Sequence, residues 1–161
     1  MDILDQKILD LLQDDAMLAV AEIAEKVGSS KSVCWRRIQR LQEKGIIKGR
    51  VTLLDQNKIG LDVILFARVK MTAHGRKVLP NFIETIKDLP QIVECYTLMG
   101  DVDFLLKIIV RDIQEYEDLW WNHLSQIDGV REISSTIAMT AVKYTTKLPL
   151  HSPDKKTAAP N

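Results

Sequence analysis

Cationic side chains on one predicted helix are the groups in this sequence with the clearest chemistry. Arg36 and Arg40 lie one turn apart in a segment that Ser30 can cap and Gly45 can end. The apolar face of this helix is formed by Cys34, Ile38 and Leu41. On the opposite side, guanidinium groups can contact the phosphates and base edges of DNA. The pattern favours a helix that enters a DNA groove, although it is also typical of a plain solvent-exposed helix.

The neighbouring segments favour the DNA-binding interpretation. Residues 2–13 and 20–27 show helical spacing, and the second of these helices ends at Gly28. Two helices joined by a tight glycine-containing turn, the second of them basic, form a helix-turn-helix pattern. Residues 46–51 then resemble a short β wing. We take six residues as candidate contacts with double-stranded DNA: Ser30, Lys31, Ser32, Arg36, Arg37 and Arg40.

Charge is distributed unevenly along the chain. The formal net charge is zero over 161 residues, which by itself argues against a nucleic-acid partner. However, residues 1–30 hold seven acidic and two basic groups, whereas residues 31–50 hold seven basic groups and one acidic group. Positive charge is therefore concentrated in the predicted recognition helix and wing, as DNA binding requires.

A second polar constellation lies between two apolar segments, at Gly100–Asp103. The two aspartates are two residues apart and share one face if the backbone is extended. Carboxylates could accept hydrogen bonds from an ammonium group, and backbone amides near Gly100 could bind a carboxylate. This combination suits an α-amino acid, although the same residues are also typical of a simple hairpin turn.

The elements around this constellation alternate in a recognisable order. Two-residue periodicity predicts strands over residues 62–71, 91–99, 103–110 and 130–142, and helical periodicity predicts helices over 78–89 and 113–127. The order β-α-β-β-α-β is that of a ferredoxin-like sandwich, whose helices cover one face of the sheet. Because the other face needs a partner, we expect a homo-oligomer. The fold class is therefore α+β.

Composition and motifs argue against several other classes. The three histidines and two cysteines show no metal-ligand spacing, and no catalytic or phosphate-loop motif occurs, so we expect no metal, no cofactor and no enzymatic activity. No apolar stretch is long enough to span a membrane. Both cysteines, Cys34 and Cys95, are predicted to be buried thiols, which suits the cytoplasm. A small-molecule-sensing enzyme or ligand-binding module with an accessory helical domain remains the alternative.

Several motifs together resemble the leucine-responsive/AsnC family of bacterial and archaeal regulators. The resemblance covers about residues 2–150 and depends on the segments Leu4–Leu9, Val27–Ser30, Arg37–Leu41, Gly45–Ile47, Gly100–Leu106 and Val142–Leu150. It implies a transcriptional regulator with an N-terminal winged helix-turn-helix and a C-terminal ferredoxin-like effector domain. Ala19 departs from the family pattern, since a capping serine or threonine is usual there.

The resemblance also implies domain boundaries and partners. Residues 1–50 would bind DNA, residues 51–60 would form a hinge strand and linker, and residues 61–150 would bind the effector and oligomerise. Composition alone predicts that residues 151–161 are a disordered tail. Members of the family form dimers to octamers and bind amino acids near the loop that corresponds to Gly100–Asp103. The candidate effectors are cysteine, leucine, methionine and proline. The candidate effector-binding residues are Met99, Gly100, Asp101, Asp103, Ser134 and Ser135.

Overall fold

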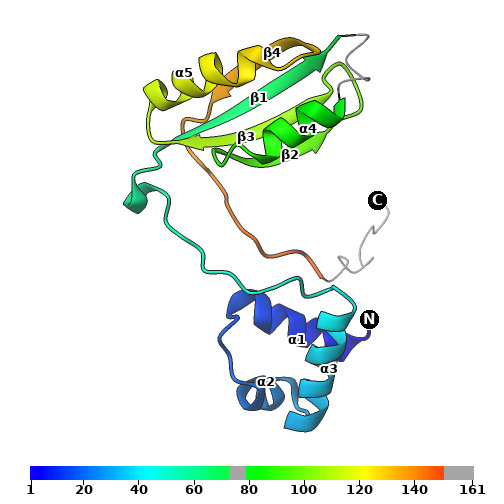
Figure 1. The fold of residues 1–161 in the computed structure, drawn as a ribbon. Helices are drawn as coiled ribbons and strands as arrows, with labels where there is room; N and C mark the ends of the chain where they lie inside the picture. The colour runs from blue at the N-terminus through cyan, green and yellow to red at the C-terminus, as the bar shows by residue number, and fades with distance from the viewer. Residues whose placement is uncertain (73–78, 151–161) are drawn as a thin grey trace, which may run out of the picture. The chain divides into compact units, whose positions relative to one another are not determined.

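The computed structural model describes residues 1–72 and 79–150, which form two compact units (Figure 1). The first unit contains residues 1–52 together with the segment that begins at Lys143. The second unit contains residues 53–142. The predicted loop at His74 and Gly75 and the predicted disordered tail at residues 151–161 lie outside the described residues.

The first unit is built on three helices, α1 (Ile3–Asp14), α2 (Val20–Val27) and α3 (Lys31–Glu43). Each helix presents an apolar stripe to the other two, as the helical spacing predicts. The buried centre of the unit consists of Ile8, Ile23, Ala24, Cys34 and Ile38. The predicted helix-turn-helix is confirmed, with α2 and α3 joined at Gly28, which adopts a left-handed backbone conformation at φ +66°.

The ends of α1 and α3 have the predicted caps. The side chain of Asp2 accepts a hydrogen bond from the Asp5 amide (2.9 Å), and the Asp5 side chain accepts one from the Asp2 amide (3.2 Å). Ser30 Oγ accepts a hydrogen bond from the Val33 amide at 3.3 Å. Beyond α3, Gly45 adopts a φ of +67°, which is the left-handed conformation that ends a helix.

Helix α2 lacks such a cap, which leads to a prediction about stability. Ala19 occupies the N-cap position, and although Glu22 accepts a hydrogen bond from its amide (2.9 Å), the Ala19 side chain offers no acceptor in return. Ala19→Ser is expected to stabilise the protein by about 1 kcal/mol, because serine would complete the capping box. Urea unfolding should show this gain, and Ala19→Val, which adds no acceptor, should not. An unchanged midpoint in the serine variant would contradict the prediction.

Residues 143–150 have no regular secondary structure but are attached to the last turn of α1. The Gln13 side chain accepts a hydrogen bond from the Leu148 amide (2.7 Å) and donates one to the Leu148 carbonyl (3.2 Å). Lys147 Nζ pairs with Asp14 at 2.5 Å. These contacts assign the segment to the helical unit, whereas the sequence predicts a second domain that runs to residue 150.

The segment after α3 differs from the prediction. The structure has no strand between residues 44 and 62, so neither the expected β wing at 46–51 nor the expected hinge strand is formed as a strand. A strand needs a neighbouring strand for its backbone hydrogen bonds. The described part of the helical unit offers none. Farther along, Asn57–Ile59 forms a short 3-10 helix, η1.

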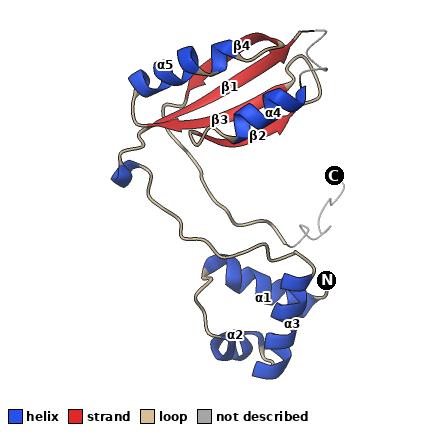
Figure 2. Ribbon diagram, in the orientation of Figure 1, coloured by secondary structure: helices blue, strands red, loops and turns tan. Residues whose placement is uncertain are grey.

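The second unit has the predicted β-α-β-β-α-β order. Its elements are β1 (Val63–Met71), α4 (Leu79–Lys87), β2 (Ile92–Thr97), β3 (Phe104–Val110), α5 (Ile113–Asn122) and β4 (Val130–Ile137). The sheet order is β2-β3-β1-β4, and all neighbouring strands are antiparallel. Figure 2 shows α4 and α5 on the same face of the sheet. The ferredoxin-like α+β fold is therefore confirmed.

Helix α5 and strand β4 show the largest differences from the predicted ends. Helix α5 ends at Asn122 instead of Ile127, and a 3-10 helix, η3 (Leu124–Gln126), follows it. The Gln126 side chain donates a hydrogen bond to the Trp121 carbonyl (2.7 Å), which would otherwise accept from the next turn. Strand β4 ends at Ile137 instead of Val142. The Ala138 amide still donates to the Ile64 carbonyl (2.9 Å), but β1 begins at Val63 and offers no partner strand for residues farther along.

The core of the second unit lies between the sheet and its two helices. Alternate residues of β1 and β3 face the helices and are buried, while the residues between them lie on the opposite, open face. Phe82 of α4 packs on Phe104 of β3, with ring centroids 4.7 Å apart. Cys34 is buried as predicted, but the prediction for Cys95 is wrong, since this thiol on the edge strand β2 is exposed.

Candidate functional site

The outward side of α3 is polar and cationic. Lys31, Ser32 and Arg36 are exposed, and no ion pair joins Lys31 or Arg36 to a carboxylate of the described residues. The hydroxyls of Ser30 and Ser32 are 3.2 Å apart, at the N-terminal end of the helix. Lys31 and Arg36 therefore offer free donors on an exposed surface that also carries the two serine hydroxyls, which is the chemistry that phosphate and base-edge contacts require.

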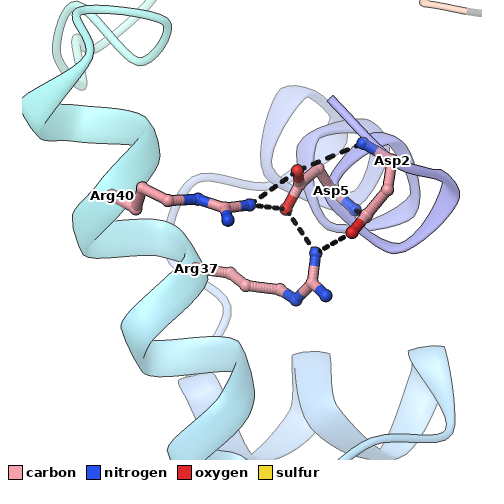
Figure 3. A network of polar contacts seen from close by, with 4 residues as sticks. All are labelled: Asp2, Asp5, Arg37 and Arg40. Carbon is pink, nitrogen blue, oxygen red and sulfur yellow. Dashed lines mark hydrogen bonds and ion pairs between the residues drawn. The ribbon is translucent and has the colours of Figure 1, made fainter.

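The other two candidate arginines are held by the N-terminus of α1 (Figure 3). Arg40 Nη2 lies 2.9 and 2.8 Å from the two carboxylate oxygens of Asp5. Arg37 Nη1 contacts Asp5 Oδ1 at 2.8 Å and Asp2 Oδ2 at 2.5 Å. The pairing of Arg40 with Asp5 is not predicted from the sequence, because helical angle alone places Arg40 on the outward face of the helix.

Burial makes this network structurally important. The Asp5 side chain is 3% exposed, whereas Arg37 is 25% and Arg40 46% exposed. Burial alone would raise the pKa of Asp5, but hydrogen bonds from Arg37 and the Asp2 amide, together with the charge of Arg40, hold it below its ordinary value. The hydrogen bond from Arg37 likewise lowers the pKa of Asp2, and both carboxylates raise the pKa of Arg37. Asp2, Asp5 and Arg37 are therefore charged at neutral pH.

The Gly100–Asp103 segment forms a tight connection between β2 and β3. The Leu98 amide donates to the Asp103 carbonyl at 2.8 Å, and Gly100 adopts a φ of +141°, a conformation that other residues rarely tolerate. Met99 and Asp101 are fully or largely exposed. The hairpin-turn interpretation is thus supported, and it does not exclude a ligand beside the turn.

Asp103 has a different environment from Asp101. Its Oδ2 accepts a hydrogen bond from the Met71 amide (2.8 Å), and its own amide donates to the Val69 carbonyl (3.0 Å). These bonds fasten the start of β3 to the end of β1. Asp103 therefore shapes the turn, yet its carboxylate also lines the cavity described next.

A cavity of about 740 Å³ opens beside the turn. Its walls are formed by Met71, Thr72, Leu79, Thr97, Leu98, Asp103, Phe104 and Arg131. Asp103 and Arg131 bring opposite charges to it, so it could accept both the ammonium and the carboxylate of a zwitterion. Sequence reasoning missed Arg131, although its position at the start of β4, which pairs with the end of β1, could have indicated it.

The other predicted effector-binding residues are not among those that line this cavity. Ser134 and Ser135 lie in the middle of β4, opposite Arg68 and Ala67 of β1. Successive residues of a strand point to opposite faces, so the two serines cannot serve one pocket together. Ser135 is on the helix-covered face, where its hydroxyl lies 2.6 Å from the Tyr116 hydroxyl.

The open face of the sheet is a further candidate site. It carries Phe66, which is 40% exposed, among half-buried apolar residues, namely Ile64, Leu105 and Ile109. Lys107 Nζ and Glu94 Oε1 form an ion pair at 3.0 Å on the same face. On the helical side, Trp120 packs against the core, whereas Trp121 is 67% exposed. The same face also carries Arg68 and the Lys70–Glu132 ion pair. Such a mixture of apolar and charged side chains is suited to contact with another protein surface.

Comparison with known proteins accounts for both units. Residues 1–48 match the profile of a winged helix-turn-helix DNA-binding domain, and residues 64–148 match that of the Lrp/AsnC ligand binding domain. No helix within residues 1–72 and 79–150 has the length and apolar content needed to cross a membrane.

Individual relatives agree with these matches. The chain is 43% identical to the glutamate uptake regulatory protein of Zymomonas mobilis, over 93% of this chain and 91% of the relative. It is 33% identical to the DNA-binding transcriptional activator DecR of Escherichia coli, over 93% of this chain and 99% of the relative.

Solved structures give the same result. An AsnC family transcriptional regulator from Agrobacterium tumefaciens superposes with a TM-score of 0.88 at 45% identity, over 93% of this chain and 97% of the other. A transcriptional regulator from Neisseria meningitidis in complex with L-Met superposes with a TM-score of 0.87 at 30% identity, over the same shares. On this evidence, the chain belongs to the Lrp/AsnC family of transcriptional regulators.

Proposed function

We propose that this protein binds a specific DNA site through α3 and that an α-amino acid bound beside the Gly100–Asp103 turn changes its affinity for DNA. The observation that carries the proposal is the exposed cationic surface of α3, at Lys31, Ser32 and Arg36, in a capped helix-turn-helix. This surface is complementary to DNA phosphates and base edges. Binding to DNA would place the protein in the cytoplasm.

All six predicted DNA contacts remain part of the proposal, with different roles. Lys31 and Arg36 have the free donors that reading of base edges requires, and the Ser32 hydroxyl, paired with that of Ser30, lies exposed beside them. Ser30 Oγ is occupied by the cap, so its contribution would be to hold the first turn of α3 against the DNA. The remaining two residues, Arg37 and Arg40, present only the donors that Asp2 and Asp5 leave unused.

The proposed effector is an α-amino acid with a small or apolar side chain. Asp103 and Arg131 would bind its ammonium and carboxylate groups, while Leu79, Leu98 and Phe104 would contact its side chain. The relative in complex with L-Met supports methionine, and cysteine, leucine and proline remain candidates. Met99, Gly100 and Asp101 would shape the entrance. Of the two predicted serines, Ser134 lies on the open face of the sheet and would reach an effector only in an assembled oligomer, whereas Ser135 faces the helices and bonds to Tyr116.

The open sheet face is the proposed contact between subunits of a dimer, which could assemble further up to an octamer. Phe66→Ala is expected to weaken self-association about tenfold, because Phe66 lies near the centre of this apolar surface. Sedimentation of the full-length protein over a dilution series would measure the change. Ile113→Ala, on the exposed surface of α5, is a matched control. Equal dissociation constants for both variants and the wild type would contradict this interface.

The function itself is tested with DNA and amino acids together. Fluorescence anisotropy would compare DNA from upstream of the protein's own gene with unrelated DNA of equal length. Thermal shift against the twenty amino acids would identify the effector, because a ligand that binds only the folded state raises stability. The identified amino acid should then change the affinity for the upstream DNA. Equal affinity for both DNAs, with no response to any amino acid, would contradict the proposal.

A further inference from the structure

Among residues 1–72 and 79–150, Asp5 is the one buried charged side chain, and the proposed function has not used it. It lies beneath two arginines of the recognition helix, on successive turns of α3. Two guanidinium groups this close repel each other. A buried carboxylate between them offsets that repulsion and fixes both side chains in one arrangement.

The atoms involved show which donors remain available. Arg37 uses only Nη1 for Asp2 and Asp5, so its Nε and Nη2, which lie on one edge of the guanidinium, have no carboxylate partner among the described residues. Arg40 uses Nη2, which leaves Nε and Nη1. At 25% and 46% exposure, both side chains reach solvent. Each arginine therefore uses some of its guanidinium N–H donors to bind the carboxylates and keeps the others available to an external acceptor.

We propose that Asp5 is a positioning residue that holds Arg37 and Arg40 so that their remaining donors contact backbone phosphates of bound DNA. The inference rests on the proposed DNA-binding function and adds a mechanism to it. Phosphate is favoured over base edges because these two arginines lie on the flank of α3 that faces α1, and not on its outward side. Phosphate contacts fix the register of a recognition helix, so they would orient Arg36 as well.

The two acidic and two basic residues of the network have no net charge, and this gives the inference a distinctive test. Asp5→Asn removes one negative charge, so it should tighten non-specific binding to unrelated DNA. It also loosens both guanidiniums, so it should weaken binding to the specific site. We expect the ratio of specific to non-specific affinity to fall at least fivefold in the full-length protein at one fixed salt concentration.

Two controls separate positioning from other effects. Glu25→Gln removes one negative charge from an exposed position on α2, where no carboxylate-arginine contact occurs among the described residues. It should leave the ratio of specific to non-specific affinity unchanged. Arg40→Ala tests the phosphate contact directly, since the slope of log affinity against log salt concentration should become shallower by about 0.9. Circular dichroism would confirm that each variant is folded.

The outcomes are distinguishable. A parallel rise of both affinities in Asp5→Asn would show that Asp5 only lowers the charge, and a parallel fall would show that it only supports the fold; each result overturns the inference. An unchanged salt slope in Arg40→Ala would overturn the phosphate contact.

If the wild type does not prefer its upstream DNA, the proposed function has failed. If Arg36→Ala weakens binding while Asp5→Asn leaves the ratio unchanged, only the present inference has failed.

Discussion

Arg36→Ala is expected to weaken binding to the specific DNA site by about 1–3 kcal/mol, which is roughly 5- to 150-fold. Arg36 is exposed on the side of α3 opposite the buried Ile38, and it forms no ion pair within the described residues. Loss of its guanidinium therefore removes a contact with DNA and nothing from the core. Anisotropy titrations at fixed salt would measure the change, and thermal unfolding should be that of the wild type.

The control for Arg36→Ala is a variant that loses one positive charge outside the helical unit. Lys87→Ala removes an exposed lysine from the end of α4, in the other unit, and should leave DNA affinity within about twofold. The double variant Arg36→Ala/Arg40→Ala should bind more weakly than either single variant. Wild-type affinity in the double variant would contradict the assignment of α3 as the recognition helix.

Arg36 and Arg40 are not equivalent tests of this helix, because their partners differ. Arg40→Ala leaves the carboxylate of Asp5, which is 3% exposed, with Arg37 as its remaining cation. A buried charge that loses a partner destabilises the folded state. A weakened affinity in Arg40→Ala therefore combines effects on DNA contact and on stability, whereas Arg36→Ala isolates the first.

Local patterns were enough to predict most of the fold. The apolar spacing of α1 and α3, their caps at Asp2 and Ser30, and the glycine at position 45 are signals that lie within a few residues of one another. The alternation along β1 and β3 is equally local. The order of these elements then restricts the topology to one familiar arrangement.

Features that depend on distant partners were missed. Residues 46–51 have strand-like composition, but a strand forms only where another strand can pair with it. The pairing of Arg40 with Asp5 joins residues 35 positions apart, and helical angle alone does not predict it. Exposure of Cys95 depends on the place of β2 at the edge of the sheet, which the apolar pattern of that strand does not encode.

In the effector site, too, local features could be predicted from the sequence, whereas contacts between distant residues could not. The Gly100–Asp103 turn and its chemistry could be read from four adjacent residues. The cavity beside it also needs Arg131 from β4 and Leu79 from α4, which the antiparallel sheet brings to the same end. Ser134 and Ser135 were grouped by sequence proximity, although adjacent strand residues face opposite ways.

Asp103→Asn is expected to abolish the stabilisation that the effector gives the wild type. At a concentration 100 times its dissociation constant, a ligand that binds only the folded state contributes about 2.7 kcal/mol. Asp103 would supply the negative charge for the ammonium group, and an asparagine amide cannot do so. Its Oδ2 also accepts the Met71 amide, so an asparagine whose carbonyl oxygen takes that place keeps the turn. Calorimetry with the amino acid identified by thermal shift would measure the loss.

Three further variants sharpen this test. Arg131→Ala should weaken effector binding as strongly, because it removes the cation that lines the cavity together with Asp103. Asp101→Asn should have a smaller effect, since Asp101 is exposed and does not line the cavity. Gly100→Ala should distort the turn through its positive φ, although nothing lies within 4 Å of the added methyl group. Asp88→Asn, in an exposed position after α4, is the charge control.

DNA binding without effector should survive all of these substitutions, because the cavity and α3 belong to different units. What should disappear is the change in DNA affinity that the effector causes. Coupling between the two sites is reciprocal, so an amino acid that weakens DNA binding must itself bind more weakly to the DNA complex. If calorimetry gives wild-type affinity for the amino acid in Asp103→Asn, Asp101→Asn and Gly100→Ala alike, the effector binds elsewhere in the protein.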